Sequence, residues 1–153
     1  MSPLDDAKVL TFDLFGTILD LGGSLTPYIS EFLETKKADV SPDEFWQQWR
    51  YRQRIEQYQD NIVMMGHSGY LSVTRKACVY TLRLNGIETT SKEINTLMEA
   101  WQQLAPFPEV VEALQRLKTR YQIVALSNGE PNFFQLLIPI PVISGAPGRR
   151  TYL

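Results

Sequence analysis

Histidine and cysteine are almost absent from this sequence, which contains one of each, His67 and Cys78, among 153 residues. A lone cysteine cannot close a disulfide within the chain, and such usage is typical of a reducing compartment. No second histidine, cysteine or carboxylate stands at metal-ligand spacing from His67, so we expect no metal site. The glycine-flanked His67 is better explained as a turn residue, and Cys78, within a helical pattern, as part of a hydrophobic core.

The sequence also lacks a long apolar run and an excess of positive charge. No window approaches the ~18 apolar residues of a membrane-spanning helix, and residues 1–7 have no basic region ahead of an apolar stretch. The 15 Lys and Arg are interspersed with 17 Asp and Glu, so the net charge is −2 and no basic stripe is available for a nucleic-acid backbone. We therefore expect a cytoplasmic protein without nucleic-acid or membrane partners.

Two short apolar runs flank a long helical region. Lys8 to Phe12 and Gln122 to Leu126 have the composition of buried strands, and each is followed by a polar residue. Between them the apolar spacing is helical from about Ser24 to Gln103, and a further helix begins at Pro108. A crossover helix between two buried strands predicts a parallel sheet. The sequence therefore predicts an α/β fold with a helical insertion.

Local signals divide this insertion into about four helices. Ser41 to Glu44 has the N-cap serine, the proline and the glutamate of a capping box, and Thr90 to Glu93 repeats the cap and the glutamate. Gly86 follows two leucines and predicts the end of a helix. The tryptophans at helical spacing are expected to pack inside the insertion: Trp46, Trp49 and Trp101.

Asp13 is the residue whose setting indicates chemistry. It follows a buried strand, and Gly16 in the next turn permits backbone angles that bring amide groups near the carboxylate. Such an aspartate can act as a covalent nucleophile that forms an ester and is regenerated by water. Thr17 could orient it by a hydrogen bond, and Ser127 and Asn128 would face it, because parallel strands end at one edge of a sheet. A turn without chemistry is the alternative that so short a motif leaves open.

Four separated stretches carry a resemblance to known enzymes. Phe12 to Thr17 (FDLFGT) is similar to the first motif of the haloacid dehalogenase superfamily, and Leu126 to Gly129 (LSNG) is similar to the second. Trp49-Arg50 and Leu104 to Phe107 (LAPF) resemble further motifs of the type II 2-haloacid dehalogenases. The resemblance extends over residues 9–134.

This resemblance implies both a domain organisation and a reaction. It implies a Rossmann-like core, with a parallel sheet, formed by residues 1–18 and 105–153, and an inserted α-helical cap formed by residues 19–104. It further implies a hydrolase that attacks a small 2-haloacid, or a similar small carboxylic acid, through Asp13. The halide would leave directly, and no cofactor would be needed. A homodimer is left open.

Arg50 and three apolar side chains complete the expected site. In enzymes of this kind a cap arginine receives the substrate carboxylate or the halide, a role that suits a permanently charged guanidinium with several donors. Leu14, Phe15 and Tyr70 could line an apolar pocket that desolvates the reacting groups, or could only pack the cap against the core. Arg52 and Arg54 lie nearby in the sequence and are the alternative candidates for the role of Arg50.

Phe15 distinguishes between two chemistries. Phosphatases of the superfamily usually carry a second aspartate two residues after the nucleophile, as a general acid and a magnesium ligand, whereas Phe15 occupies that position here. A phosphate-ester leaving group needs a proton, but a departing halide does not. We therefore favour dehalogenation over the alternative of a phosphatase, which predicts magnesium dependence.

The end of the sequence departs from the superfamily pattern. Family members continue with a lysine that neutralises the nucleophile and with acidic or polar residues that position water, but here no lysine follows Lys118 and no Asp or Glu follows Glu130. Val142 to Ser144 could form a third strand, and Arg149 or Arg150 could replace the lysine. We therefore expect an incomplete, C-terminally truncated core. A catalytically impaired fragment and a partner-binding cap without chemistry remain alternatives.

Overall fold

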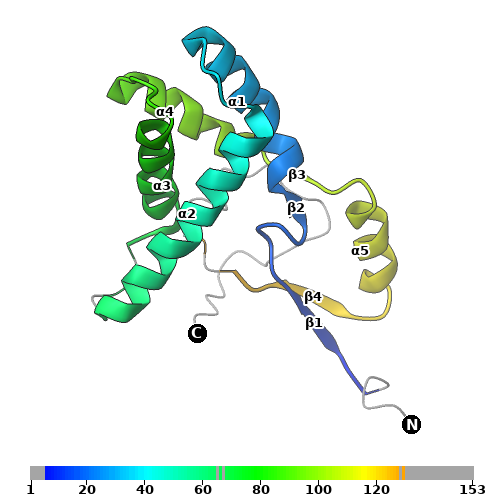
Figure 1. Ribbon diagram of the computed structural model, residues 1–153. Helices are drawn as coiled ribbons and strands as arrows, with labels where there is room; N and C mark the ends of the chain where they lie inside the picture. Colours follow the sequence, from blue (N-terminus) through cyan, green and yellow to red (C-terminus); the bar gives the residue numbers. More distant parts are fainter. Residues whose placement is uncertain (1–5, 65, 67, 128, 130–153) are drawn as a thin grey trace.

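A computed structural model describes residues 6–64, 66, 68–127 and 129 (Figure 1). Four expectations lie outside the described residues: the roles of His67 and Asn128, the third strand at Val142 to Ser144, and the replacement of a lysine by Arg149 or Arg150. The elements along the chain are β1 (Val9–Phe12), β2 (Leu19–Asp20), α1 (Leu21–Lys36), α2 (Pro42–Val63), α3 (Tyr70–Leu84), α4 (Ser91–Glu99), the 3-10 helix η1 (Ala100–Gln103), β3 (Ala105–Pro106), α5 (Val110–Lys118) and β4 (Gln122–Ala125).

Strands β1 and β4 pair in parallel, as the sequence predicts, but the expected burial is wrong, because only Ile123 in these two strands is buried. Val9 lies opposite Gln122 and Phe12 lies opposite Ala125. The ladder continues past β4, because the Leu126 N–H donates to the Phe12 carbonyl at 2.8 Å. Both strands therefore end at the same edge, where Asp13 follows β1 and Leu126 and Ser127 follow β4. Helix α5 makes the crossover and packs on β4 (Figure 1).

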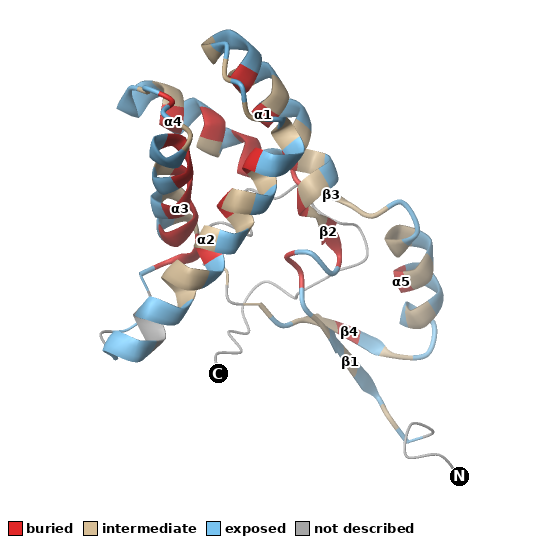
Figure 2. Ribbon diagram, viewed as in Figure 1, coloured by how far each residue is buried: buried red, intermediate tan, exposed pale blue. Residues whose placement is uncertain are grey.

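Helices α1 to α4 form the predicted helical insertion, and their buried faces point towards one another (Figure 2). Helices α2 and α3 make the most extensive contact. The largest fully buried side chains include Trp49, Trp101 and Tyr70, and Cys78 is completely buried beside them. The rings of Trp49 and Trp101 meet edge to face with their centroids 6.0 Å apart. An aromatic core thus supports α2, the helix that carries Arg50.

Three helix ends follow the sequence signals. The Thr90 side chain accepts from the backbone N–H of Glu93, whose side chain in turn accepts from the Thr90 N–H, so the capping box is complete. At the start of α2, the Ser41 hydroxyl accepts from the Glu44 N–H at 3.2 Å. Gly86, just beyond α3, has a φ of +65°, a value that favours glycine.

The start of α1 differs from the expectation. The helix begins at Leu21, three residues before the predicted start at Ser24, because the Asp20 side chain caps it and accepts from the Gly23 N–H at 2.8 Å. A Cβ atom at Gly23 would collide with this carboxylate. The two glycines that weaken the helical pattern therefore belong to the first turn of the helix.

The short strands β2 and β3 connect the helical insertion to the sheet-bearing part. They pair antiparallel, with Leu19 opposite Pro106 and Asp20 opposite Ala105. This pairing was not predicted. It places the point where the chain enters the helices beside the point where it leaves them (Figure 1). None of the helices in the described ranges is both long enough and apolar enough to cross a membrane.

Candidate active site

The turn after β1 holds Asp13 at the edge of the sheet. The Leu14 carbonyl accepts backbone hydrogen bonds from Ile18 at 3.1 Å and Leu19 at 2.8 Å, which closes the chain into a compact loop. Gly16 has a φ of +88°, which is unfavourable for residues with a side chain, and its N–H donates back to the Leu19 carbonyl at 3.0 Å. The loop is therefore fixed by its own backbone.

Thr17 interacts directly with the carboxylate. Its hydroxyl donates to Asp13 Oδ2 at 3.2 Å, and both residues are exposed rather than buried. A hydrogen bond to one carboxylate oxygen restricts rotation of the group and leaves the other oxygen available. The arrangement gives an oriented, solvent-accessible carboxylate at the end of a strand.

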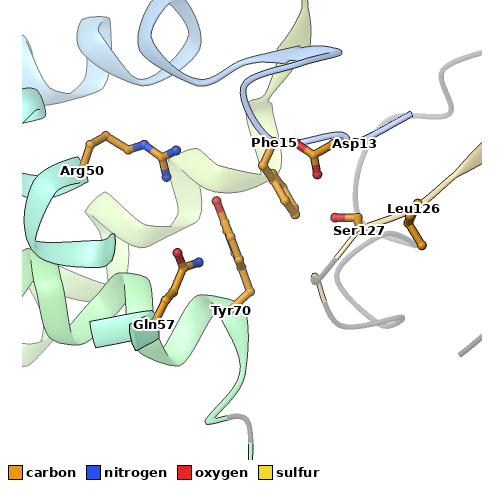
Figure 3. Close-up of a pocket in the computed structure, with 7 residues that line it drawn as sticks. All are labelled: Asp13, Phe15, Arg50, Gln57, Tyr70, Leu126 and Ser127. Carbon is orange, nitrogen blue, oxygen red and sulfur yellow. The ribbon is translucent and has the colours of Figure 1, made fainter. Parts of the chain in front are cut away.

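A cavity of about 550 Å³ opens beside this carboxylate. Figure 3 shows Asp13 and Ser127 on one side, Arg50 and Gln57 on the other, and the rings of Phe15 and Tyr70 between them. The cavity therefore lies between the ends of the parallel strands and helix α2, with the first residue of α3 contributing as well. Its lining residues are Asp13, Phe15, Arg50, Gln57, Tyr70, Leu126 and Ser127.

Arg50 supplies the positive charge of the cavity. Its side chain is held by Gln53, because the Arg50 Nη1 donates to Gln53 Oε1 at 2.7 Å. The Arg50 Cζ also lies 5.7 Å from the ring centroid of Trp46, within cation–π range. The neighbouring Arg52 bonds to Glu56 instead, since its Nε donates to Glu56 Oε1 at 2.9 Å.

Phe15 and Tyr70 form the apolar wall. Both are almost fully buried, with 8% and 2% of their surfaces exposed. The Tyr70 hydroxyl is buried and makes no hydrogen bond within the part of the chain that the structure describes. Burial raises the pKa of Tyr70, and the Asp13 charge acts in the same direction, while the nearby polar groups of Gln53 and Arg50 oppose the shift. The phenol is therefore neutral at physiological pH.

The structure brings most of the expected site residues together. Asp13, Phe15, Arg50, Tyr70 and Ser127 line one cavity, and Thr17 is bonded to Asp13 without lining the cavity itself. Leu14, which was expected with them, does not line the cavity. Its side chain is 5% exposed and packs in the hydrophobic core, so it lies outside the set of lining residues.

Sequence reasoning missed three residues of the site. Gln57 and Leu126 line the cavity, and Gln53 accepts a hydrogen bond from Arg50. A signal for the glutamines was present, because Arg50, Gln53 and Gln57 follow at intervals of three and four and so share one helix face. Over the described ranges, no group of three or more His, Cys, Asp or Glu residues could hold a metal ion.

Comparison with known proteins identifies the family. A family model described as haloacid dehalogenase-like hydrolase matches residues 7–142. The chain belongs to this family. Its relatives include an (S)-2-haloacid dehalogenase from Pseudomonas sp. (strain YL), 29% identical over 88% of this chain and 56% of that protein. Another is the (S)-2-haloacid dehalogenase 4A of Burkholderia cepacia, 28% identical over 86% of this chain and 54% of that protein.

A solved structure agrees with the family assignment. The fold is similar to that of the L-2-haloacid dehalogenase from Xanthobacter autotrophicus, with a TM-score of 0.70 and 27% identity over 86% of this chain and 50% of that chain. The match supports the Rossmann-like haloacid dehalogenase fold that the sequence predicts. The present chain spans slightly more than half of the length of the curated relatives it matches.

Proposed function

We propose that this member of the haloacid dehalogenase-like hydrolase family cleaves the carbon–halogen bond of a small 2-haloacid through Asp13. One observation carries the proposal: a single cavity has the Asp13 carboxylate on one side and the Arg50 guanidinium on the other, with the Phe15 and Tyr70 rings between them. Such a site suits a short molecule with an anionic end and an electrophilic carbon. The names of the relatives support the same substrate class.

The proposed reaction has two steps. A carboxylate oxygen of Asp13 attacks C2 of the substrate, a carbon–oxygen ester bond forms, and the halide leaves with the bonding electron pair. Water then attacks the carbonyl carbon of the ester. This second step releases a 2-hydroxy acid and a proton and regenerates the Asp13 carboxylate. The balance is one water consumed and one halide and one proton released.

The other residues have supporting roles in this proposal. Thr17 orients the Asp13 carboxylate by its hydrogen bond of 3.2 Å. Ser127 offers a hydroxyl on the same side of the cavity, and Arg50 receives the substrate carboxylate or the halide. Phe15 occupies the position of the phosphatase acid and contributes apolar surface, which suits a leaving group that needs no proton.

We also propose the domain division that accompanies this reaction. Residues 1–18 and 105–153 would form the core with the nucleophile, and residues 19–104 would form the cap with the arginine. The paired strands β2 and β3 support this division, because they lie at both proposed boundaries.

Halide release from 2-chloropropionate by the full chain tests the proposal. We expect release by the wild type and none by Asp13→Asn, with Asp39→Asn as the matched control because Asp39 is exposed at the joint between α1 and α2. Release that persists in Asp13→Asn would refute the role of this carboxylate. No release from a folded wild-type chain would refute the proposed activity of the chain.

A single turnover in oxygen-18-labelled water tests the ester. If water attacks the carbonyl carbon, the label enters the Asp13 carboxylate and appears there when the peptide is analysed by mass spectrometry. Label in the hydroxy acid after one turnover, with an unlabelled Asp13 peptide, would instead indicate direct attack of water on the substrate.

A further inference from the structure

Gln53 is a polar side chain with no exposed surface, and it stands directly behind the charged residue of the cavity. Its Oε1 accepts from Arg50 Nη1 at 2.7 Å. Its Nε2 donates to the Thr74 hydroxyl, also at 2.7 Å. Buried polar side chains are retained in a fold when each polar atom has a partner, and both polar ends of this amide have one.

The Arg50 guanidinium fixes which way the amide points, because it only donates hydrogen bonds, whereas the Thr74 hydroxyl can donate or accept. If the amide were reversed, its NH₂ group would face the guanidinium, and two donors would meet without an acceptor. Thr74 is itself anchored, because it is fully buried on α3 and its carbonyl accepts from Trp49 Nε1 at 2.9 Å. Trp49 and Gln53, on consecutive turns of α2, therefore both bond to Thr74 of α3. Gln53 in turn bonds to Arg50.

The other two arginines of this segment lack such a support in the described structure. Arg52 is paired with Glu56, its Cζ lies 4.1 Å from the ring centroid of Tyr80, and it does not line the cavity. Arg54 is exposed. The buried acceptor behind Arg50 is thus a specific feature of the arginine that lines the cavity.

We propose that Gln53 is a positioning residue that aims the Arg50 guanidinium into the cavity, with Thr74 anchoring the other end of the Gln53 amide. The identity of the anion that Arg50 receives rests on the proposed function, but the positioning itself does not. Gln53 accepts from one donor of the guanidinium, and the Tyr70 side chain lies close to both groups. An arginine held in this way loses less side-chain entropy when it binds an anion.

The variant that tests this proposal is Gln53→Met, which keeps the length of the side chain and removes both hydrogen bonds. Gln48→Met is the matched control. Gln48 lies on the same helix and bonds to the residue that follows α3, because its Oε1 accepts from Asn85 Nδ2 at 2.7 Å, but it does not line the cavity. If Gln53→Met fails to fold, Gln53→Asn is the second variant, since its shorter amide cannot span from Arg50 to Thr74.

The first measurement concerns the free protein and needs no activity. The nitrogen-15 heteronuclear NOE of the Arg50 Nε–H group, assigned by its loss in Arg50→Lys, reports the mobility of this side chain. We expect an ordered group in the wild type and in Gln48→Met, and a mobile group in Gln53→Met. Equal order in all three proteins would overturn the proposal, and so would equal mobility in the two glutamine variants.

The second measurement is binding of propionate, an unreactive short carboxylate, followed by the shift of the same resonance. We expect the affinity of Gln53→Met to fall about tenfold, the scale of one hydrogen bond to a charged group. Gln48→Met should bind as the wild type does. An unchanged affinity in Gln53→Met would overturn the claim that positioning serves anion binding. If the wild type binds no propionate at Arg50, the proposed function loses its anion site, while the NOE measurement still decides the positioning.

Discussion

The rings of Phe15 and Tyr70 stack across the cavity wall, with their centroids 4.2 Å apart and their planes 12° from parallel. Phe15 belongs to the turn that follows β1, and Tyr70 is the first residue of α3. The stack therefore joins the segment that carries Asp13 to the helical insertion. It also places two apolar faces between the carboxylate of Asp13 and the guanidinium of Arg50, as Figure 3 shows.

Replacement of Tyr70 by phenylalanine tests the state of its hydroxyl. Because this buried hydroxyl makes no hydrogen bond within the described residues, Tyr70→Phe should keep the stack and raise the free energy of unfolding by about 1 kcal/mol. Urea denaturation measures the change. Tyr80→Phe, on the same helix but 44% exposed, is the control and should be nearly neutral. Clear destabilisation by Tyr70→Phe would mean that the hydroxyl has a partner.

The hydrogen bond from Thr17 to Asp13 should affect catalysis more than binding. Thr17→Val keeps the shape of the side chain and removes the donor, so the nucleophile loses its orientation and kcat should fall about tenfold with little change in KM. Steady-state halide release measures both constants. Thr17→Ser retains the hydroxyl and should retain most of the rate. A valine variant with wild-type kcat would contradict this role.

Replacement of Arg50 by lysine should weaken substrate binding. Arg50→Lys keeps the positive charge but loses the planar fork, and we expect KM for 2-chloropropionate to rise about tenfold. The matched control is Arg54→Lys, because Arg54 lies one helical turn further along α2 and is exposed. Equal effects of the two substitutions would argue that net charge, rather than a specific guanidinium, attracts the substrate.

Glu93 should make the free energy of unfolding depend on pH in the acid range. The hydrogen bond from Lys36, at 2.6 Å, and those from Thr90 lower the pKa of Glu93 from 4.5 to about 2. Because the folded-state pKa is depressed, this contribution is present above pH 4.5 and is lost as the pH falls towards 2. The urea midpoint should therefore decline more steeply over this window in the wild type than in Glu93→Gln.

A second variant identifies the cause of that slope. Lys36→Met removes the group with the largest effect on the pKa of Glu93 and should also flatten the decline. If both variants follow the wild-type curve between pH 5 and 2, then Glu93 is not responsible for the acid sensitivity in this range.

Local chemistry explains which parts of the fold were predictable. The apolar runs at β1 and β4 and the Thr90 capping box are each contained within a few consecutive residues. The Asp20 cap of α1 gives the same kind of signal, an aspartate just before the helix, but two glycines follow it, and glycine has a low intrinsic preference for helices. In that case the specific side-chain bond outweighs the intrinsic preference of glycine.

The parts that could not be predicted depend on contacts between distant residues. Strands β2 and β3 have two residues each and come from opposite ends of the insertion, so neither has a periodicity of its own. For Leu14 the sequence left two roles open, a pocket wall and core packing, and only contacts with distant residues decide for the core. The role of Gln53 depends on Thr74, which belongs to another helix, and only the shared helix face with Arg50 hints at it.

The pairing of β2 with β3 brings the two ends of the helical insertion together. Leu19–Asp20 and Ala105–Pro106 are paired neighbours, so the helical segment between them leaves and rejoins the rest of the chain at one place. A change within the helices can therefore alter the side of the cavity that carries Arg50, while the turn that carries Asp13 keeps its own backbone hydrogen bonds.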